Sequence, residues 1–387
     1  MRICIIGSGL SGLSASFYLS QYDDMRITLH EQASVFGGRA NVAQGGEHCA
    51  RLFLKDYNYL FSILGIIRTP DGRSVFDSLR QVKRYCHTMT SGWVELSHLY
   101  PLLARELSLA ERLGMAKARR MSPLLAEQNI GSNTNRYGAR SNYSLLSLIR
   151  MASNLSRSKV AYALEGPTNE CLIAPWVSHL EERGVELKRE ASVNAIRPEA
   201  HGVSIYSEAR WKIFDAVIVA AFVSDVVSLL TASCIEHSMA MFNHAHCKCL
   251  TLQLDVRERV LASEQPALYC HNGINIVVQP KHNRCVVLCT RSASTDEDYV
   301  LNRVREYLNL KYELADVKVR DNQRAEEAIY AADYIDQDKI LRRRRPHIYF
   351  AGSYITNSYP VDSGEGAVRS AFNVVQRMQK EYGLRRG

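Results

Sequence analysis

A short apolar run that ends in a glycine-rich turn constrains the fold of this chain more than any other feature. Residues 2–6 read RICII, and GSGLSG follows directly at residues 7–12. A β-branched apolar run that ends at glycine is typical of a buried parallel strand. Leu13, Phe17 and Leu19 then continue with helical spacing. The stretch therefore predicts a strand, a tight turn and a helix, which is the unit that binds dinucleotides in α/β folds.

Each glycine of this turn has a separate physical role. Gly7 permits the tight turn, Gly9 lets a pyrophosphate approach the backbone, and Gly12 lets the helix lie close to the strand. Leu10 and Ser11 open the helix, whose free N–H groups and positive dipole end attract phosphate. These five residues are predicted to contact a dinucleotide.

An acidic residue follows the second predicted strand. Residues 26–30 read RITLH, and Glu31 and Gln32 come next. A carboxylate at this place binds ribose hydroxyl groups in dinucleotide-binding folds, so both residues are predicted to contact the cofactor. The alternative interpretation is a solvent-exposed acid at the end of a strand.

The sequence after Glu31 distinguishes between dinucleotides. Five residues separate Glu31 from Gly37, Gly38 and Arg39. This E-x5-G-G-R pattern resembles the large FAD-binding family that holds amine oxidases, phytoene and carotene desaturases and hydroxysqualene dehydroxylases. In that family the loop wraps the cofactor phosphates and approaches the flavin, so the resemblance implies FAD. The residue types suit this role, because glycine permits close approach and a guanidinium group binds phosphate oxygens.

Two later segments extend the resemblance. In the family a valine at the position of Val193 holds the adenine ring through its backbone. Residues 347–353 (HIYFAGS) and 363–368 (SGEGAV) resemble the C-terminal signature, in which the last helix points at the flavin pyrimidine ring. The dipole of that helix would stabilise negative charge on the ring. The resemblance implies cofactor contacts at Gly352, Ser353, Gly364, Glu365, Gly366 and Ala367.

The matched segments predict an α/β fold with a discontinuous Rossmann-like FAD-binding domain, a second, mixed-sheet substrate domain and a helical insertion. The FAD-binding parts are residues 1–68, 166–231 and 336–387. Residues 69–165 form a substrate or cap region with the helical insertion at 96–165, and residues 232–335 form the substrate domain. Within the substrate domain, residues 250–254 alternate like a half-exposed strand.

The reacting side of the flavin is marked more weakly. In the desaturase branch a glycine-rich turn that contains histidine stands at a similar place, which puts His48 and Arg51 near the flavin. The alternative for His48 is a surface turn. Tyr359 is a third candidate, because amine oxidases carry an aromatic residue just before the Glu-Gly-Ala segment and this chain has Ser363 and Gly364 there. Tyr354 is a similar substitute.

These observations favour an FAD-dependent oxidoreductase that takes a hydride from a small or apolar organic substrate, in the manner of a desaturase or dehydrogenase. The first alternative is a flavin amine or amino-acid oxidase, which would need aromatic walls around the amine. The second is a redox-neutral, flavin-dependent isomerase.

Composition limits the setting of this reaction. The chain has 387 residues, 46% hydrophobic and 23% charged, which is typical of a soluble globular protein. Its ten cysteines form no C-x-x-C pair, so we expect reduced thiols, a cytoplasmic location and no metal site. The net charge of +8 permits contact with an anionic membrane, but no distinctive amphipathic helix supports it. No nucleic-acid module is present, and the oligomeric state stays open.

Overall fold

The computed structural model describes most of the chain outside one long central segment. The expected helical insertion lies largely outside the described residues, which are 1–43, 46–48, 51–88, 92–97, 105–106, 108–109, 160–239, 245–258, 266–271, 274–289, 296–325, 336–343, 345–357, 359 and 363–385.

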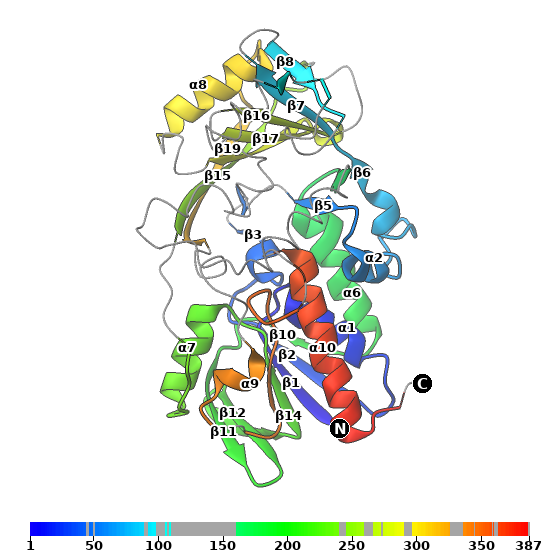
Figure 1. Cartoon of the computed structure of the whole chain (residues 1–387), viewed down its shortest axis with the longest axis vertical. Helices are drawn as coiled ribbons and strands as arrows, with labels where there is room; N and C mark the ends of the chain where they lie inside the picture. Colours follow the sequence, from blue (N-terminus) through cyan, green and yellow to red (C-terminus); the bar gives the residue numbers. More distant parts are fainter. Residues whose placement is uncertain are drawn as a thin grey trace.

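A five-stranded parallel sheet forms the lower half of the molecule in Figure 1, with the order β10-β2-β1-β14-β20. All four strand pairs are parallel. Its strands come from the beginning, middle and end of the chain, as the discontinuous Rossmann-like prediction requires. Their bounds are β1 (Arg2–Ile6), β2 (Arg26–His30), β10 (Glu186–Lys188), β14 (Ala216–Val219) and β20 (Ile348–Phe350).

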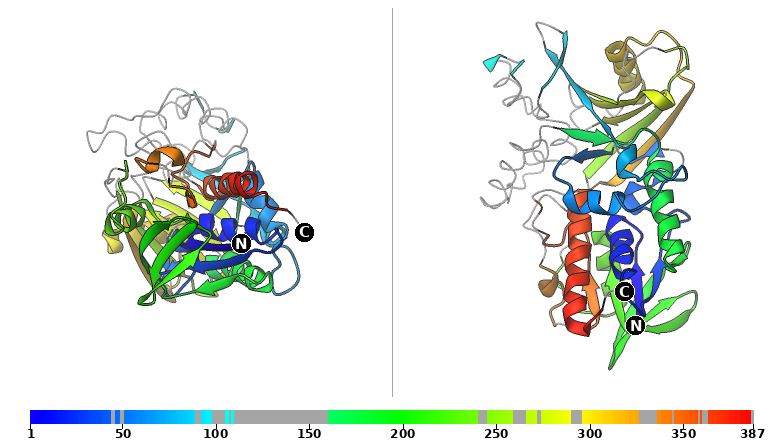
Figure 2. Two further views of the ribbon diagram at one scale, coloured as in Figure 1. Left: turned by 90° about the horizontal axis from the view of Figure 1, so that it is seen from below. Right: turned by 90° about the vertical axis from the view of Figure 1, so that its right-hand side faces the viewer.

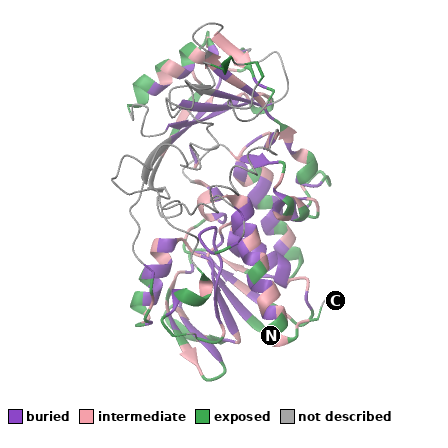
Figure 3. Cartoon of the chain, in the orientation of Figure 1, coloured by how far each residue is buried: buried purple, intermediate pink, exposed green. Residues whose placement is uncertain are grey.

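Strand β1 shows why both faces of this sheet are apolar. Ile3 and Ile5 share a core with the helices of one face, whereas Cys4 and Ile6 share a second core with the other face. Successive side chains of a strand point to opposite faces, so a fully apolar run is buried on both. Figure 3 shows this burial along the sheet. The first face is covered by α1 (Leu10–Leu19), α6 (Ala174–Glu182) and α10 (Gly364–Tyr382), as Figure 2 shows.

The other face packs against an antiparallel sheet and a helix. These are β11 (Val193–Glu199), β12 (Gly202–Ser207), β13 (Arg210–Phe214) and α7 (Val223–Ala232). Strands β11 and β12 form an antiparallel hairpin, and β13 adds a third strand. Leu172, Trp176 and Leu180 are fully buried. Leu172 lies in a π-helical turn, Asn169–Ile173, directly before α6.

A seven-stranded mixed sheet forms the upper half of Figure 1, in the order β19-β15-β18-β17-β16-β7-β8. Only β16 and β7 pair in parallel. Helix α8 (Glu297–Leu308) covers one face through Val300, Val304 and Leu308. The strands are β7 (Lys83–Thr88), β8 (Gly92–Glu95), β15 (Ala245–Gln253), β16 (Ala267–His271), β17 (Ile274–Gln279), β18 (Arg284–Cys289) and β19 (Asp316–Ala325).

The expectation of a half-exposed strand at residues 250–254 is wrong. Leu250 and Leu252 are buried against the α8 side, and Thr251 is only 7% exposed. Strand β15 lies between β19 and β18, and its second face turns toward the parallel-sheet domain. The backbone N–H of Glu47 donates to Thr251 Oγ1 at 3.0 Å there. A polar residue in an alternating pattern therefore marks an interface between the two sheets.

Shorter elements connect the two halves. Strands β5, β9 and β6 form a small sheet beside α2, and β3 pairs with β4. Their bounds are β3 (Val42–Ala43), β4 (Gly46–Glu47), β5 (Leu52–Leu54), α2 (Asn58–Leu64), β6 (Arg80–Gln81), β9 (Ala161–Ala163) and α9 (Gln337–Ile340). Among the described residues, no helix is long and apolar enough to cross a membrane.

Candidate functional site

The glycine turn after β1 lies at the carboxyl end of the parallel sheet. Gly7 has a φ of +97°, and a Cβ atom there would lie 2.8 Å from the carbonyl oxygen of Ala220. A Cβ at Gly12 would lie 1.9 Å from the carbonyl oxygen of Gly7. Both glycines are therefore required by the packing of the turn between β1, β14 and α1.

Gly9 is different from its two neighbours in the motif. Its φ of −60° and ψ of 174° suit any residue. A Cβ built there meets no atom of the described residues within 4 Å. The fold itself therefore gives no reason for glycine. The position faces open space at the start of α1, whose N-terminus has no side-chain cap and no acidic residue in its first turn.

The Gly-Gly-Arg loop lies directly on this turn. The N–H of Gly37 donates to the carbonyl and hydroxyl oxygens of Ser8, both at 3.1 Å. Gly38 has a φ of +53°, and a Cβ there would lie 2.9 Å from the Cα of Gly9. The structure thus brings together the two glycine-rich segments that the sequence assigned to one cofactor.

Glu31 is buried beside the same turn. Its Oε2 accepts hydrogen bonds from the N–H and hydroxyl groups of Ser8, at 3.0 and 2.5 Å, and its Oε1 accepts from the N–H of Ala33 at 2.9 Å. The residue is only 7% exposed, which excludes the surface-acid alternative. Ser8, which is fully buried, was missed by the sequence analysis. Its position inside the G-x-G motif was the available signal.

The neighbours of Glu31 differ in their exposure. Gln32 is exposed to solvent. Val193, half-buried, begins β11 directly after residues that bond to the end of β2. The N–H of Ala191 donates to the carbonyl oxygen of Glu31 at 2.9 Å. The segment that leads into β11 therefore lies beside the end of β2.

Arg39 connects the N-terminal motif to the segment after β20. Its Nη2 donates to Ser353 Oγ at 3.0 Å, and its guanidinium carbon lies 5.6 Å from the ring centroid of Phe222. A Cβ at Gly352 would lie 2.3 Å from the ring of Tyr354. The predicted cofactor residues Arg39, Gly352 and Ser353 are thus adjacent, and Phe222 is an addition that the sequence analysis missed.

The start of α10 lies against the start of α1. A Cβ at Gly364 would lie 3.1 Å from Leu10 Cδ1. Ser363 caps α10, because its hydroxyl oxygen accepts from the N–H of Gly366 at 3.1 Å. Ala367, in the same first turn, is buried. Two helix N-termini therefore converge at the carboxyl end of the parallel sheet.

Glu365 has a structural function that the sequence did not indicate. Its Oε1 and Oε2 accept from the N–H groups of Tyr59 and Leu60 at 3.1 and 2.9 Å, which caps helix α2. Arg369 Nε donates to Oε1 at 2.7 Å. The side chain is fully buried, and this burial raises the pKa of the carboxyl group. Contact of Glu365 with a cofactor stays a prediction, since both oxygens already serve the fold.

The three candidates for the reacting side occupy unlike places. His48 is half-buried directly after β4. Arg51 Nη2 donates to the carbonyl oxygen of Arg39 at 2.6 Å, so it supports the Gly-Gly-Arg loop. Tyr359 is 1% exposed, and its hydroxyl group donates to Asp56 Oδ1 at 3.1 Å. Burial raises the pKa of Tyr359 above the usual tyrosine range.

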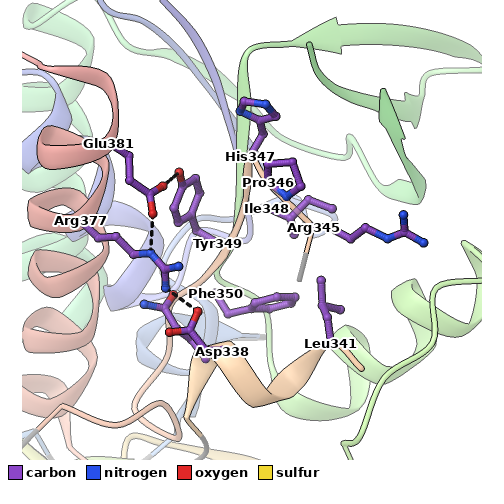
Figure 4. Close-up of a pocket in the computed structure, with 11 residues that line it drawn as sticks. Asp338, Leu341, Arg345, Pro346, His347, Ile348, Tyr349, Phe350, Arg377 and Glu381 are labelled. Carbon is purple, nitrogen blue, oxygen red and sulfur yellow. Dashed lines mark hydrogen bonds and ion pairs between the residues drawn. The ribbon is translucent and has the colours of Figure 1, made fainter. Parts of the chain in front are cut away.

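A pocket at the opposite end of the parallel sheet does not belong to this site. It lies between the start of β20 and the last turns of α10 (Figure 4). Arg377, which lines it, pairs with Asp338 at 2.7 Å and with Glu381 at 3.0 Å. Its cation therefore already has partners, and the pocket lies far from the glycine turn.

Comparison with known proteins agrees with this geometry. Residues 5–65 match the family of NAD(P)-binding Rossmann-like domains. This segment has the Rossmann-like fold. No curated protein sequence matches the chain closely enough to indicate a relative.

Solved structures share the fold of the whole chain, at low sequence identity. An Exiguobacterium sp. 255-15 protein, provisionally described as a protoporphyrinogen oxidase, is 16% identical with a TM-score of 0.63, covering 98% of this chain and 99% of its own. An oxidoreductase from Methanosarcina mazei is 14% identical with a TM-score of 0.61, covering 97% and 100%. Cyclohexylamine oxidase from Brevibacterium oxydans IH-35A is 13% identical with a TM-score of 0.59, covering 99% of each chain. The predicted α/β architecture is confirmed.

Proposed function

We propose that this chain is an FAD-dependent oxidoreductase that takes a hydride from a carbon atom of a small or apolar organic substrate. One observation carries the proposal. Gly9 has an ordinary backbone conformation and open space where a side chain would be, at the uncapped start of α1. A ligand that needs close approach to the backbone, such as a pyrophosphate, explains a glycine that the fold does not require.

The surrounding residues fit FAD. The N-termini of α1 and α10 lie side by side and offer free N–H groups to phosphate and to the flavin ring. Glu31 is held by Ser8 and Ala33, and the free acceptor capacity of its oxygens suits the ribose hydroxyl groups. Arg39, fixed by Ser353, places a cation at the same edge. FAD, when bound, supplies the hydride acceptor at flavin N5.

The seven-stranded sheet supports the second half of the proposal. Its inner face turns toward the carboxyl end of the parallel sheet, where the Rossmann fold binds its ligand. Leu268, Val277 and Val286 of that face belong to the same apolar core as the nucleotide-binding domain. A substrate held between the two sheets would be shielded from water, which hydride transfer requires.

The tyrosines near the C-terminal signature favour dehydrogenation over amine oxidation. Tyr354 is 5% exposed and donates to the carbonyl oxygen of Ala221 at 3.2 Å, whereas Tyr359 is 1% exposed and donates to Asp56. Both rings are therefore enclosed in the fold and present little surface to an amine. A flavin amine or amino-acid oxidase is the second candidate, and the cyclohexylamine oxidase fold keeps it in consideration.

Replacing Gly9 tests the cofactor. We expect Gly9→Val to purify without flavin, because its side chain would occupy the space left for the pyrophosphate, and to unfold at the temperature of the flavin-free wild type. Gly65→Ala is the control, since Gly65 also has an ordinary φ of −69° but lies at the end of α2. A Gly9→Val protein that purifies with full FAD would exclude this cofactor assignment.

Anaerobic bleaching of the bound flavin tests the reaction. Purified oxidised protein is mixed with a panel of amines and amino acids, and separately with a panel of apolar polyenes, alcohols and cyclic metabolites. We expect the flavin absorbance to fall only with the second panel. Bleaching by amines would instead support the oxidase.

A further inference from the structure

Arg84, on the inner face of the seven-stranded sheet, is buried without a partner among the described residues. The residue is 3% exposed, and its Nε and Nη1 atoms are enclosed with no hydrogen bond. Because a guanidinium group stays charged inside proteins, such burial is strongly unfavourable unless a partner is supplied. The cofactor proposal gives this residue no role.

Arg284, a second buried arginine of the same sheet, has partners on both terminal nitrogens. Arg284 is 5% exposed, its Nη2 donates to Glu47 Oε1 at 3.1 Å, and its Nη1 donates to Gln279 Oε1 at 3.0 Å. The contrast between Arg84 and Arg284 shows that this fold satisfies a buried guanidinium where the charge is structural. Arg84 is thus a candidate for pairing with a molecule from outside the chain.

The strand register shows which way Arg84 faces. Arg84 pairs with Leu268 across β7 and β16, and paired residues point to the same face of a sheet. Leu268, and Val82 two residues before Arg84, belong to the apolar core shared with the nucleotide-binding domain. Tyr85 points the other way and stacks on Tyr269 at 4.9 Å, on the α8 side. Arg84 therefore faces the domain that carries the glycine turn.

A second unsatisfied donor lies on the same face. Asn275 on β17 is 5% exposed, and its Nδ2 atom is enclosed with no partner among the residues that the structure describes. Asn275 pairs with Cys270, which pairs with Cys86, two residues beyond Arg84. Two strand spacings and two residues of rise place the Cα atoms of Arg84 and Asn275 roughly 12 Å apart.

We propose that Arg84 and Asn275 bind a substrate that carries a carboxylate. The planar carboxylate pairs with the guanidinium group of Arg84, and the amide of Asn275 donates to a second acceptor on the same molecule. The inference rests on the proposed function, because it names the substrate class of that oxidoreductase. The carbon skeleton between the two polar contacts lies along the apolar face formed by Leu268 and Val277.

Binding of matched pairs of small molecules tests the proposal. The probes are acetate, benzoate and octanoate, each beside its uncharged amide, with inorganic phosphate as a separate arm. Affinity is measured by equilibrium dialysis and by the shift of the unfolding temperature. We expect at least one carboxylate to bind about tenfold or more tightly than its amide. Equal binding within every pair, no binding of any carboxylate, or binding of phosphate alone would overturn the proposal.

Two substitutions locate the effect. Arg84→Met should abolish the preference for carboxylate and, because it removes an unpaired buried charge, should raise the unfolding temperature of the ligand-free protein. Lys83→Gln is the matched control, because it removes a cation from the same strand whose Nζ pairs with Glu95 at 3.7 Å on the solvent side. Retention of the carboxylate preference by Arg84→Met would contradict the assignment, as would its loss in Lys83→Gln.

The flavin content of the same samples keeps this test separate from the cofactor assignment. Arg84→Met should purify with as much flavin as the wild type, since the residue lies on the other sheet. Flavin-containing protein with no carboxylate preference would disprove the substrate class and leave the oxidoreductase standing. Wild-type protein that contains no flavin but still prefers carboxylates would disprove the oxidoreductase and leave the carboxylate site standing.

Discussion

The parallel-sheet domain and the seven-stranded mixed sheet carry different kinds of polar groups. In the parallel-sheet domain the positions that we propose to face a ligand are glycines and backbone N–H groups, as at Gly9 and the uncapped start of α1. On the seven-stranded sheet they are the polar side chains of Arg84 on β7 and Asn275 on β17. Glycines and backbone N–H groups suit a phosphate group, which is common to all nucleotide cofactors. Polar side chains suit a substrate that must be distinguished from similar molecules.

The difference also concerns how buried charges are held. Glu31 is satisfied by groups close to it in space and in the same domain, namely Ser8 and Ala33. The Oε1 atom of Glu47 instead accepts from Arg284 of the seven-stranded sheet and from the N–H of Thr168, and its Oε2 atom is enclosed with no partner among the described residues. The glycine turn is therefore self-contained, whereas β4 is held to the seven-stranded sheet partly by a buried pair of charges from distant parts of the chain.

The largest effect that we expect comes from breaking that pair. Arg284→Met leaves the carboxylate of Glu47, which is 2% exposed, buried without its cation. Loss of one partner of a buried ion pair lowers the free energy of unfolding by about 3–5 kcal/mol, measurable by denaturant titration. The double variant Glu47→Leu with Arg284→Met should recover most of that loss.

A surface pair provides the control for this comparison. Arg257 and Asp255 lie 2.8 Å apart, against 3.1 Å for Arg284 and Glu47, but the Arg257 side chain is 64% exposed. Arg257→Met should leave stability nearly unchanged, because water screens an exposed pair. An equal loss of unfolding free energy in the two arginine variants would show that the buried Glu47–Arg284 pair stabilises the protein no more than the exposed pair does.

The glycine turn gives the next largest effect. Gly12→Ala places a Cβ 1.9 Å from the carbonyl oxygen of Gly7, so the helix must move away from the strand. Overpacking of this kind lowers the free energy of unfolding by about 1–3 kcal/mol or more. Gly9→Ala should leave the free energy of unfolding almost unchanged, because its Cβ meets no atom of the described residues within 4 Å. Similar losses at both positions, compared in flavin-free protein, would remove the distinction between structural and ligand-facing glycines.

This contrast explains how far the sequence alone could predict the molecule. The first domain was predictable because its signals are local: a β-branched run, three glycines at fixed spacing and an acid after the next strand. Glu365 was read as a cofactor residue, and its capping of α2 was not foreseen, because the N–H groups of Tyr59 and Leu60 lie some three hundred residues earlier in the chain. Sequence spacing carries no information about such a partner.

The second domain was predictable only as architecture. The alternation at residues 250–254 correctly indicated a strand, but it could not show that the Glu47 turn covers the polar face at Thr251. Arg84 belongs to no motif, and only the register of β7 against β16 shows that it faces the nucleotide-binding domain. Which face of a sheet a strand residue points to can be assigned to a domain only once the strand pairing is known.

A smaller effect separates packing from catalysis at Tyr359. Tyr359→Phe removes the hydrogen bond to Asp56 and should lower the free energy of unfolding by about 1 kcal/mol. Turnover should be retained, because the ring is enclosed between Tyr57 and Arg369. A rate loss of about a hundredfold or more, measured by flavin bleaching, would instead assign proton transfer to this hydroxyl group.

The smallest expected effect is a dependence of the free energy of unfolding on pH that comes from Glu365. Comparison of the wild type with Glu365→Gln, whose side chain is neutral, measures it. Burial raises the pKa of Glu365 above its ordinary value of 4.5, so the folded state binds the proton more tightly than the unfolded state does. The stabilising contribution of this proton is complete below that ordinary value and is lost as the pH rises through the raised folded pKa.

The free energy of unfolding of the wild type should therefore fall relative to that of Glu365→Gln over that pH interval. Above the interval the two curves should run parallel. The difference between their free energies of unfolding, measured by denaturant titration at several pH values, isolates this one group. A difference that grows in favour of wild type with rising pH would mean that the N–H groups of α2 and Arg369 outweigh burial, and that the carboxylate is a stabilised anion at the start of α10.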